Sequence, residues 1–368
     1  MPWLIDFAEA SAKTDQLRSE KDHLFLLAAG LMGEAGSILS ELKKQRRDSQ
    51  LLSSSQEILR EEFGDFLWYY VRLVSRLSPD LLPQLEQLAD SSDRVEKSIL
   101  PLSIEFANAV GTVMESVRYG VSDDSLSATP NHDLVRLWSR LKALARGVEV
   151  SLHEAAQKNI RKTTSRWPIE RKYLPLFDED FSEDQQLPRQ IGVEFREVSC
   201  DGRLTVVLRC NGLNCGDRIS DNIQTADGYR FHDVFHLAYA VHLGWSPITR
   251  ALFRCKRKSI TRIDEGEDGA RAGVIEEAIS ALVFERAKRL HFFGNLDHVD
   301  YDLLKTVQSL VSGYEVEQAP MWQWEAAILD GYRIFRELIR NRGGLVRVDL
   351  QGRQMSYATF AVASHVAV

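Results

Sequence analysis

The feature that most constrains the fold is the helical spacing of apolar residues through the first 170 positions. Within residues 22–46 and again within 54–77, apolar side chains recur every three or four positions. This spacing puts them on one face of a helix, and other helices must cover that face. Shorter stretches of the same kind follow near 82–90, 94–118, 132–147 and 151–165. We therefore expect a helical bundle over residues 1–169.

The pattern changes after residue 169. Residues 170–190 are acidic, contain two prolines and show no periodicity, so they are expected to form a linker. Alternating β-branched residues on either side of Asp201-Gly202 predict a hairpin over 193–210, and a second hairpin is expected about Gln351-Gly352. Helical patterns occupy most of the sequence between the two hairpins. The expected fold class is mainly α, with a second helical domain at 191–368 that carries short β-hairpins near both ends.

The charge balance and the cysteines exclude several classes of protein. The 46 Lys and Arg residues against 53 Asp and Glu residues give a net charge of −7, which argues against an extended nucleic-acid surface but allows a local phosphate pocket. No apolar run approaches the roughly 18 residues of a membrane span, and the first residues lack a signal-peptide pattern. The 4 cysteines have no CxxC spacing. These features predict a cytoplasmic protein that has no membrane partner.

An acidic group stands out on the two longest predicted helices. Glu62 and Asp65 are three residues apart and therefore share a helix face, next to Phe63 and Phe66, which should be in the core. A buried carboxylate without a partner is costly, and a hard divalent cation relieves that cost. Glu34 on the neighbouring helix could complete a cluster of oxygen ligands. From spacing alone, a solvated acidic face is favoured somewhat over a metal site.

Three sequence segments add a family resemblance. GLMGEAGSILSELKK at 30–44, LREEFGDFLWYYV at 59–71 and SLHEAAQKNIRKTTSRWP at 151–168 resemble the MazG-like superfamily of all-α nucleotide pyrophosphohydrolases. That family carries a Glu-x-x-Glu motif on one helix, a Glu-x-x-Asp motif on the next, and a closing helix whose Asn, Lys and Arg lie near the substrate phosphates. The resemblance covers most of residues 20–168.

The resemblance implies an enzyme that cleaves a nucleoside triphosphate between its α and β phosphates, releasing a monophosphate and pyrophosphate. It implies Mg²⁺ as the cofactor, with Mn²⁺ as a substitute, and pairing of helical units in a homodimer or an intrachain pseudo-dimer. The implied metal ligands are Glu34, Glu62 and Asp65, and Glu61 or Glu34 would orient the attacking water. The implied phosphate contacts are Asn159, Lys162 and Arg166. Lys43 and Lys44 are further candidates for substrate binding, or simply a solvated pair.

One position departs from the family motif. Ser37 stands where the second glutamate of Glu-x-x-Glu belongs, and a serine hydroxyl is an uncharged, poorer metal ligand. Glu41, one turn further along, could partly substitute for it. The alternative function is therefore a catalytically weak protein that binds or senses nucleotides. A helical scaffold with structural polar networks is a third possibility.

A second constellation lies in the C-terminal half. His232, Asp233, His236 and a later Glu277 can share neighbouring helix faces, and imidazoles favour transition metals over Mg²⁺. A buried polar network of the same residues is equally open. The segment around Glu277 also reads like a second copy of residues 61–68, so this half is a candidate diverged MazG-like domain. The basic residues between these helices are candidate phosphate holders or a solvated face, namely Lys256, Arg257 and Lys258.

Overall fold

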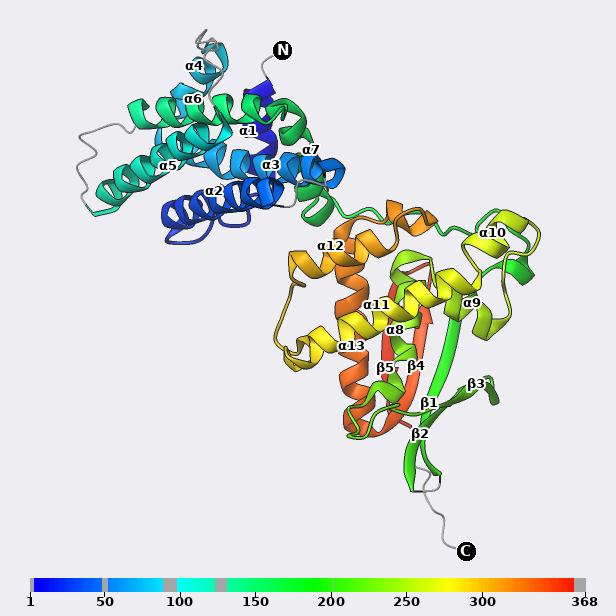
Figure 1. Ribbon diagram of the computed structural model, residues 1–368. Helices are drawn as coiled ribbons and strands as arrows, with labels where there is room; N and C mark the ends of the chain where they lie inside the picture. The colour runs from blue at the N-terminus through cyan, green and yellow to red at the C-terminus, as the bar shows by residue number, and fades with distance from the viewer. Residues whose placement is uncertain (1–2, 48–51, 89–97, 123–130, 201, 361–368) are drawn as a thin grey trace, which may run out of the picture. The chain divides into compact units, whose positions relative to one another are not determined.

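The computed structural model describes residues 3–47, 52–88, 98–122, 131–200 and 202–360 (Figure 1). The chain divides into two compact units, Met1–Ile169 and Glu170–Val368, which we call unit 1 and unit 2. The mainly α class is confirmed, with a small sheet in addition to the helices.

Unit 1 is built from helices, and its described residues contain no strand. The apolar stripes that predicted these helices form its core, where Leu31, Ile38, Phe63 and Phe66 are fully buried. Helices α2 and α3 pack against each other, α3 also packs against α7, and α5 packs against α6. The first helix had no counterpart in the sequence-based expectations. The helices are α1 (Trp3–Lys13), α2 (His23–Arg47), α3 (Leu52–Leu77), α4 (Leu82–Gln87), α5 (Ile99–Ser122), α6 (Asn131–Gly147) and α7 (Leu152–Arg166).

Helix α2 is long and apolar enough to cross a membrane by length and composition alone. Core helices pass the same test, and Leu27, Leu31 and Ile38 of α2 are fully buried inside unit 1. Only 28% of the most apolar stretch of α2 is buried, so packing in the bundle accounts for part of its composition.

The strands of unit 2 form one antiparallel sheet in the order β3-β2-β1-β4-β5. Both expected hairpins are present, and β1 joins them by pairing with β4, Val193 opposite Val346. Gly202, with φ +77°, supports the expected turn, whereas Asp201 lies outside the described residues. The third strand was not expected, because its sequence, LNCGDRI, does not alternate. The strands are β1 (Gln190–Cys200), β2 (Arg203–Cys210), β3 (Leu213–Ile219), β4 (Gly343–Asp349) and β5 (Gln354–Ala358).

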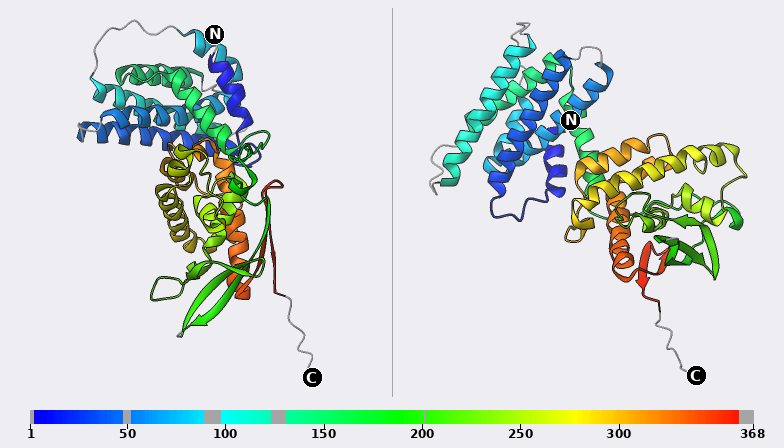
Figure 2. Two further views of the ribbon diagram at one scale, coloured as in Figure 1. Left: turned by 90° about the vertical axis from the view of Figure 1, so that its right-hand side faces the viewer. Right: turned by 60° about the horizontal axis from the view of Figure 1, so that its bottom comes forward.

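Helices of unit 2 pack on this sheet and on one another (Figures 1 and 2). Helix α8 is buried from Val234 to Leu243, and it packs against α13 and the strands β4 and β5. Gly331 lets α13 approach closely, since a Cβ there would lie 3.1 Å from that of Ala238. The helices are α8 (Asp233–Leu243), α9 (Pro247–Phe253), α10 (Thr261–Gly266), α11 (Ala270–Lys288), α12 (Tyr301–Leu310) and α13 (Met321–Asn341).

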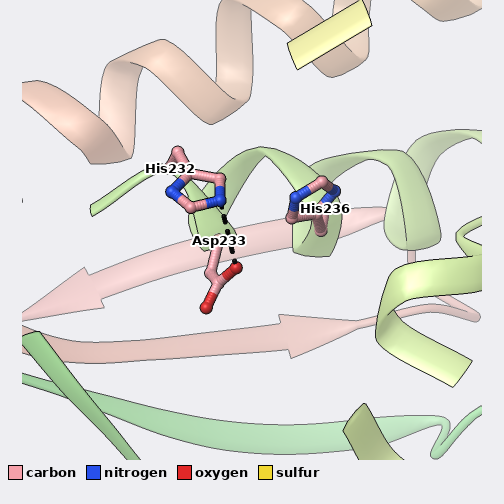
Figure 3. Close-up of side chains that lie close together, drawn as sticks. All are labelled: His232, Asp233 and His236. Carbon is pink, nitrogen blue, oxygen red and sulfur yellow. Dashed lines mark ion pairs between the residues drawn. The ribbon is translucent and has the colours of Figure 1, made fainter. Parts of the chain in front are cut away.

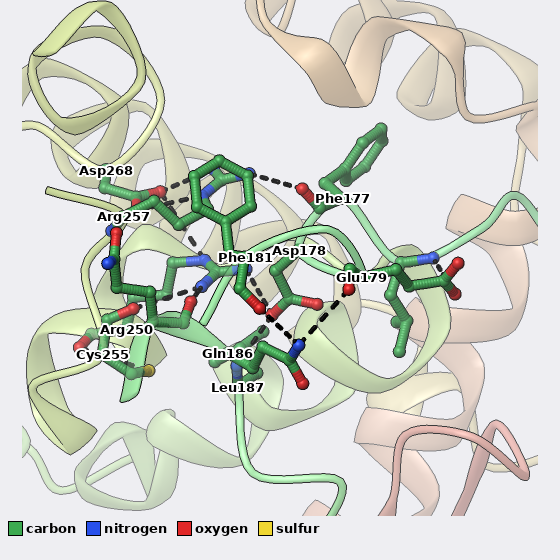
Figure 4. Close-up of polar contacts among 12 residues, drawn as sticks. Phe177, Asp178, Glu179, Phe181, Gln186, Leu187, Arg250, Cys255, Arg257 and Asp268 are labelled. Atoms are coloured by element: carbon green, nitrogen blue, oxygen red, sulfur yellow. Dashed lines mark hydrogen bonds and ion pairs between the residues drawn. The ribbon is translucent and has the colours of Figure 1, made fainter. Parts of the chain in front are cut away.

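The expected linker at 170–190 is instead a folded part of unit 2 (Figure 4). Asp178 is fully buried and accepts hydrogen bonds from the Arg250 guanidinium (2.8 Å) and the Leu187 backbone N–H (2.7 Å). Arg257 donates to the Phe177 carbonyl at 3.1 Å. The segment that was expected to be a solvated linker therefore supplies an acidic partner for the buried Arg250 and a backbone carbonyl for the buried Arg257.

Candidate functional site

The acidic residues expected to act together do converge between α2 and α3. One carboxylate oxygen from each of Glu34, Glu62 and Asp65 lies within 4.8 Å of the others. All three residues are half-buried. Glu62 and Asp65 share one face of α3 because they are three residues apart, and the packing of α2 against α3 brings Glu34 next to that face.

Helix α7 completes the cluster from a third side. A Cβ at Gly64 would lie 2.6 Å from the Ala155 carbonyl oxygen, so glycine is what allows α7 to approach α3 this closely. The approach brings the buried Asn159 to Asp65, to which its Nδ2 donates a hydrogen bond of 2.8 Å. Lys162, one turn later, donates to both oxygens of Asp65. Two of the three expected phosphate contacts therefore lie at the acidic cluster.

Negative charge is in excess at this cluster. Burial, followed by the charges of Asp65 and Glu62, raises the pKa of Glu34 to about 7. Lys162 opposes this shift without cancelling it. Burial and the charge of Glu34 also raise the pKa of the neighbouring Tyr69. A group of carboxylates in this state would gain stability from a bound cation.

The fourth acidic candidate, Glu61, faces lysines of α7. Its carboxylate lies 3.7 Å from Lys158 and 3.6 Å from Lys162. Lys158, which we had not expected in the site, also forms an ion pair of 2.6 Å with Glu57. It precedes Lys162 by one helical turn, and that i,i+4 spacing was the signal that could have identified it.

Other predicted residues of unit 1 lie in different surroundings. Glu41 is buried and pairs with Lys44 at 3.3 Å, so it does not replace the missing carboxylate at Ser37 within the cluster. Lys43 is exposed on α2. Arg166 stacks over the ring of Trp167 at 4.5 Å, one turn beyond Lys162.

The second predicted constellation also converges, at the start of α8 (Figure 3). His232, Asp233 and His236 offer ligand atoms within 4.8 Å of one another. Glu277 of α11 reaches both imidazoles, with its oxygens 3.7 Å from His232 Nε2 and 3.3 Å from His236 Nε2. Burial would lower the pKa of His236, but the charges of Glu276 and Glu277 raise it well above its ordinary value. Burial would raise the pKa of Glu277, but the two imidazoles hold it well below its usual range.

The neighbouring Glu276, rather than Glu277, is the fully buried acid of α11. It accepts hydrogen bonds from His236 Nδ1 (2.8 Å), the Ser246 hydroxyl (2.6 Å) and the Ile248 N–H (2.9 Å). Sequence spacing could not distinguish which of Glu276 and Glu277 would be buried, since both positions lie near the apolar face.

The basic residues that follow α9 lie in different surroundings. Arg257 is fully buried, with ion pairs to Asp268 (2.7 Å) and Glu315 (2.6 Å), so its expected role as a phosphate holder is wrong. Lys258 is exposed and Lys256 is half-buried.

Comparison with known proteins gives one family match. A family model described as the MazG C-terminal domain matches residues 172–361, which is nearly all of unit 2. Searches of curated proteins and of solved structures found no match.

Proposed function

We propose that this chain, which belongs to the MazG C-terminal domain family, hydrolyses nucleoside triphosphates between the α and β phosphates. A MazG-type domain suggests a nucleotide pyrophosphohydrolase in general. The proposed products are a nucleoside monophosphate and pyrophosphate. The active site in this proposal is the cluster of Glu34, Glu62 and Asp65 in unit 1. The observation that carries the proposal is the convergence of these three carboxylates with Asn159 and Lys162.

The residues present fit a hard divalent cation. The donor set is made of carboxylate oxygens, which Mg²⁺ and Mn²⁺ prefer. The amide oxygen of Asn159 is buried and has no hydrogen-bond partner among the described residues, which leaves one polar atom available for a ligand. When bound, the ion would neutralise phosphate charge and lower the pKa of a water.

The chain's own residues would divide the remaining work. Lys162 now neutralises Asp65, and a triphosphate would offer its ammonium group a second anionic partner. Asn159 is held by Asp65 and would orient a phosphate oxygen through its amide. Glu34, on the helix that faces Glu62 and Asp65, would orient the attacking water.

The test is an assay of pyrophosphate and monophosphate release over a panel of NTPs and dNTPs, with Mg²⁺ and with Mn²⁺. We expect release from at least one nucleotide, and a loss of about 100-fold or more in Glu62→Gln, which removes a ligand charge. The control is Glu9→Gln, which changes an exposed carboxylate on α1 of the same unit and should keep full activity. Folded protein that releases no pyrophosphate from any nucleotide would reject the catalytic proposal.

A second candidate function rests on Ser37. The cluster has three carboxylates rather than four, and Glu41 pairs with Lys44 instead of supplying the fourth. A protein that binds or senses nucleotides without rapid turnover is therefore the alternative proposal. It predicts that a nucleotide with Mg²⁺ raises the melting temperature while no product forms.

A further inference from the structure

The imidazole cluster of unit 2 is a separate site, with a donor set different from that of unit 1. We propose that His232, His236, Asp233 and Glu277 hold one divalent transition-metal ion through both imidazole Nε2 atoms and the two carboxylates. The proposal concerns unit 2 alone and does not depend on the nucleotide chemistry proposed for unit 1.

Both imidazoles are held with Nε2, rather than Nδ1, facing the carboxylates of Asp233 and Glu277. His232 Nδ1 donates to the backbone carbonyl of Tyr229 at 2.9 Å, and its ring stacks on that of Tyr229 at 4.3 Å. His236 Nδ1 donates to Glu276, whose oxygens also accept from a hydroxyl and a backbone N–H. A carbonyl or a carboxylate that already accepts such bonds requires the proton to be on Nδ1. In each neutral imidazole, Nε2 is therefore the atom that carries a lone pair.

These Nε2 lone pairs point to groups that are themselves acceptors. His232 Nε2 lies 3.7 Å from Asp233 Oδ1 and 3.7 Å from Glu277 Oε2, and His236 Nε2 lies 3.3 Å from Glu277 Oε1. His236 is 2% exposed, and its Nε2 has no partner of hydrogen-bond geometry among the described residues. Acceptors that face one another across this space need a positive charge between them. A second proton on an imidazole supplies that charge in the absence of metal, in line with the raised pKa of His236, and a bound ion would replace that proton.

The spacing suits a metal ion better than a proton. Metal–nitrogen and metal–oxygen bonds of about 2.1 Å around a tetrahedral ion separate the ligand atoms by about 3.4 Å. The observed separations of 3.3 to 3.7 Å fall around that value, whereas hydrogen bonds are usually shorter. The hydrogen bonds of the two Nδ1 atoms also match those of metal-bound histidines, which commonly donate their second N–H to a carboxylate or a carbonyl. Glu276 and the Tyr229 carbonyl supply those contacts here.

The donor set indicates which ions would bind. Two imidazoles with two carboxylates favour Zn²⁺, Mn²⁺, Fe²⁺, Co²⁺ or Ni²⁺ over Mg²⁺ and Ca²⁺, which prefer oxygen ligands throughout. An excess of Mg²⁺ should therefore leave a bound transition metal in place.

The test is a titration of the chelator-treated full chain with Co²⁺, followed by its visible absorption, and with Zn²⁺ as a competitor. Every protein in the series carries Glu62→Gln, which disables the cluster of unit 1. We expect one ion per chain. Its dissociation constant should rise at least about tenfold in Glu277→Gln and about 100-fold in His236→Ala. Because the Glu277 side chain is 42% exposed, its substitution should leave unit 2 folded even if the histidine variant is unstable.

The matched control is His298→Gln, which changes an exposed histidine that pairs with Glu325 in the same unit. Its Co²⁺ affinity should stay within twofold of the parent. The proposal is overturned if the folded parent binds no Co²⁺ or Zn²⁺, or if Glu277→Gln binds as tightly as the parent. Nitrogen NMR that finds both imidazoles doubly protonated after addition of metal would also overturn it.

Discussion

Two groups of charged residues in this protein, one fully buried in unit 2 and one half-buried in unit 1, differ in their balance of charge. In unit 2, Arg250 and Arg257 are matched by Asp178 and Asp268 in a network of short ion pairs. In unit 1, the carboxylates of Glu34, Glu62 and Asp65 gather with excess negative charge, as the raised pKa of Glu34 shows. The matched network holds a segment of chain in place, whereas the unmatched cluster costs free energy that a bound cation would offset. The comparison teaches that a structural cluster is both buried and balanced in charge, whereas a candidate site is partly exposed and carries an excess of one charge.

The largest effect is expected from removing one charge from the matched network, which tests whether that network stabilises unit 2. Asp268 is 1% exposed and accepts from the backbone N–H of Arg257 at 2.7 Å and from its guanidinium at 2.7 and 3.1 Å. Asp268→Asn should destabilise unit 2 by about 2–4 kcal/mol, because it breaks a buried ion pair and leaves Glu315 as the acidic partner that Arg257 keeps among the described residues. Urea unfolding measures this, with the exposed Glu265→Gln as the control. A loss below about 1 kcal/mol would contradict a structural role for the network.

The next prediction concerns the helix contact that assembles the unmatched cluster. Gly64→Ala should cost about 1–3 kcal/mol, since its Cβ would meet the Ala155 carbonyl and push α7 away from α3. Gly36→Ala is the matched control on α2, because nothing lies within 4 Å of its Cβ, and it should stabilise by roughly 0.5–1 kcal/mol. Equal effects in thermal unfolding of the two variants would show that the close approach at Gly64 is not required.

Removing a charge from the unmatched cluster should raise the free energy of unfolding instead of lowering it. The pKa of Glu34 is raised from 4.5 to about 7 on folding, so its contribution to stability is full below pH 4.5 and is lost as the pH rises through 7. Glu34→Gln should therefore stabilise unit 1 at pH 8 by roughly 1–2 kcal/mol, with allowance for solvent screening, and change little at pH 4.5. Unfolding at both pH values measures this. Destabilisation at pH 8 without metal would contradict an excess of negative charge.

The smallest expected effect comes from restoring the missing ligand. Ser37 is half-buried, one turn after Glu34 on α2. Ser37→Glu should add a fourth carboxylate and tighten Mg²⁺ binding roughly tenfold, since affinity for hard cations follows the number of charged ligands. The Mg²⁺ concentration that gives half-maximal pyrophosphate release measures this, and Ser37→Gln is the uncharged control. An unchanged Mg²⁺ requirement would place position 37 outside the ion's reach.

Local patterns predicted the parts of this fold that short segments determine. The spacing of Leu31 and Ile38 on α2, and of Phe63 and Phe66 on α3, predicted the two helices and the edge where the acids meet. Alternation about Gly202 likewise predicted the first hairpin. In each case the residues that specify the element lie within one or two turns of each other.

The patterns failed where distant residues decide the outcome. Asp178 looked like part of a solvated linker, because the arginine that buries it, Arg250, is 72 residues away in the sequence. Arg257 looked like a phosphate ligand for the same reason, since Asp268 and Glu315 neutralise it from other elements. Local charge does not reveal which distant partner will pair with it.

The central claim is that the carboxylates of α2 and α3 hold a divalent cation, and anomalous scattering from crystals soaked in Mn²⁺ tests it most directly. We expect a manganese peak within bonding distance of oxygens from Glu34, Glu62 and Asp65. Well-ordered crystals that show these three side chains converged but no manganese between them would contradict the account.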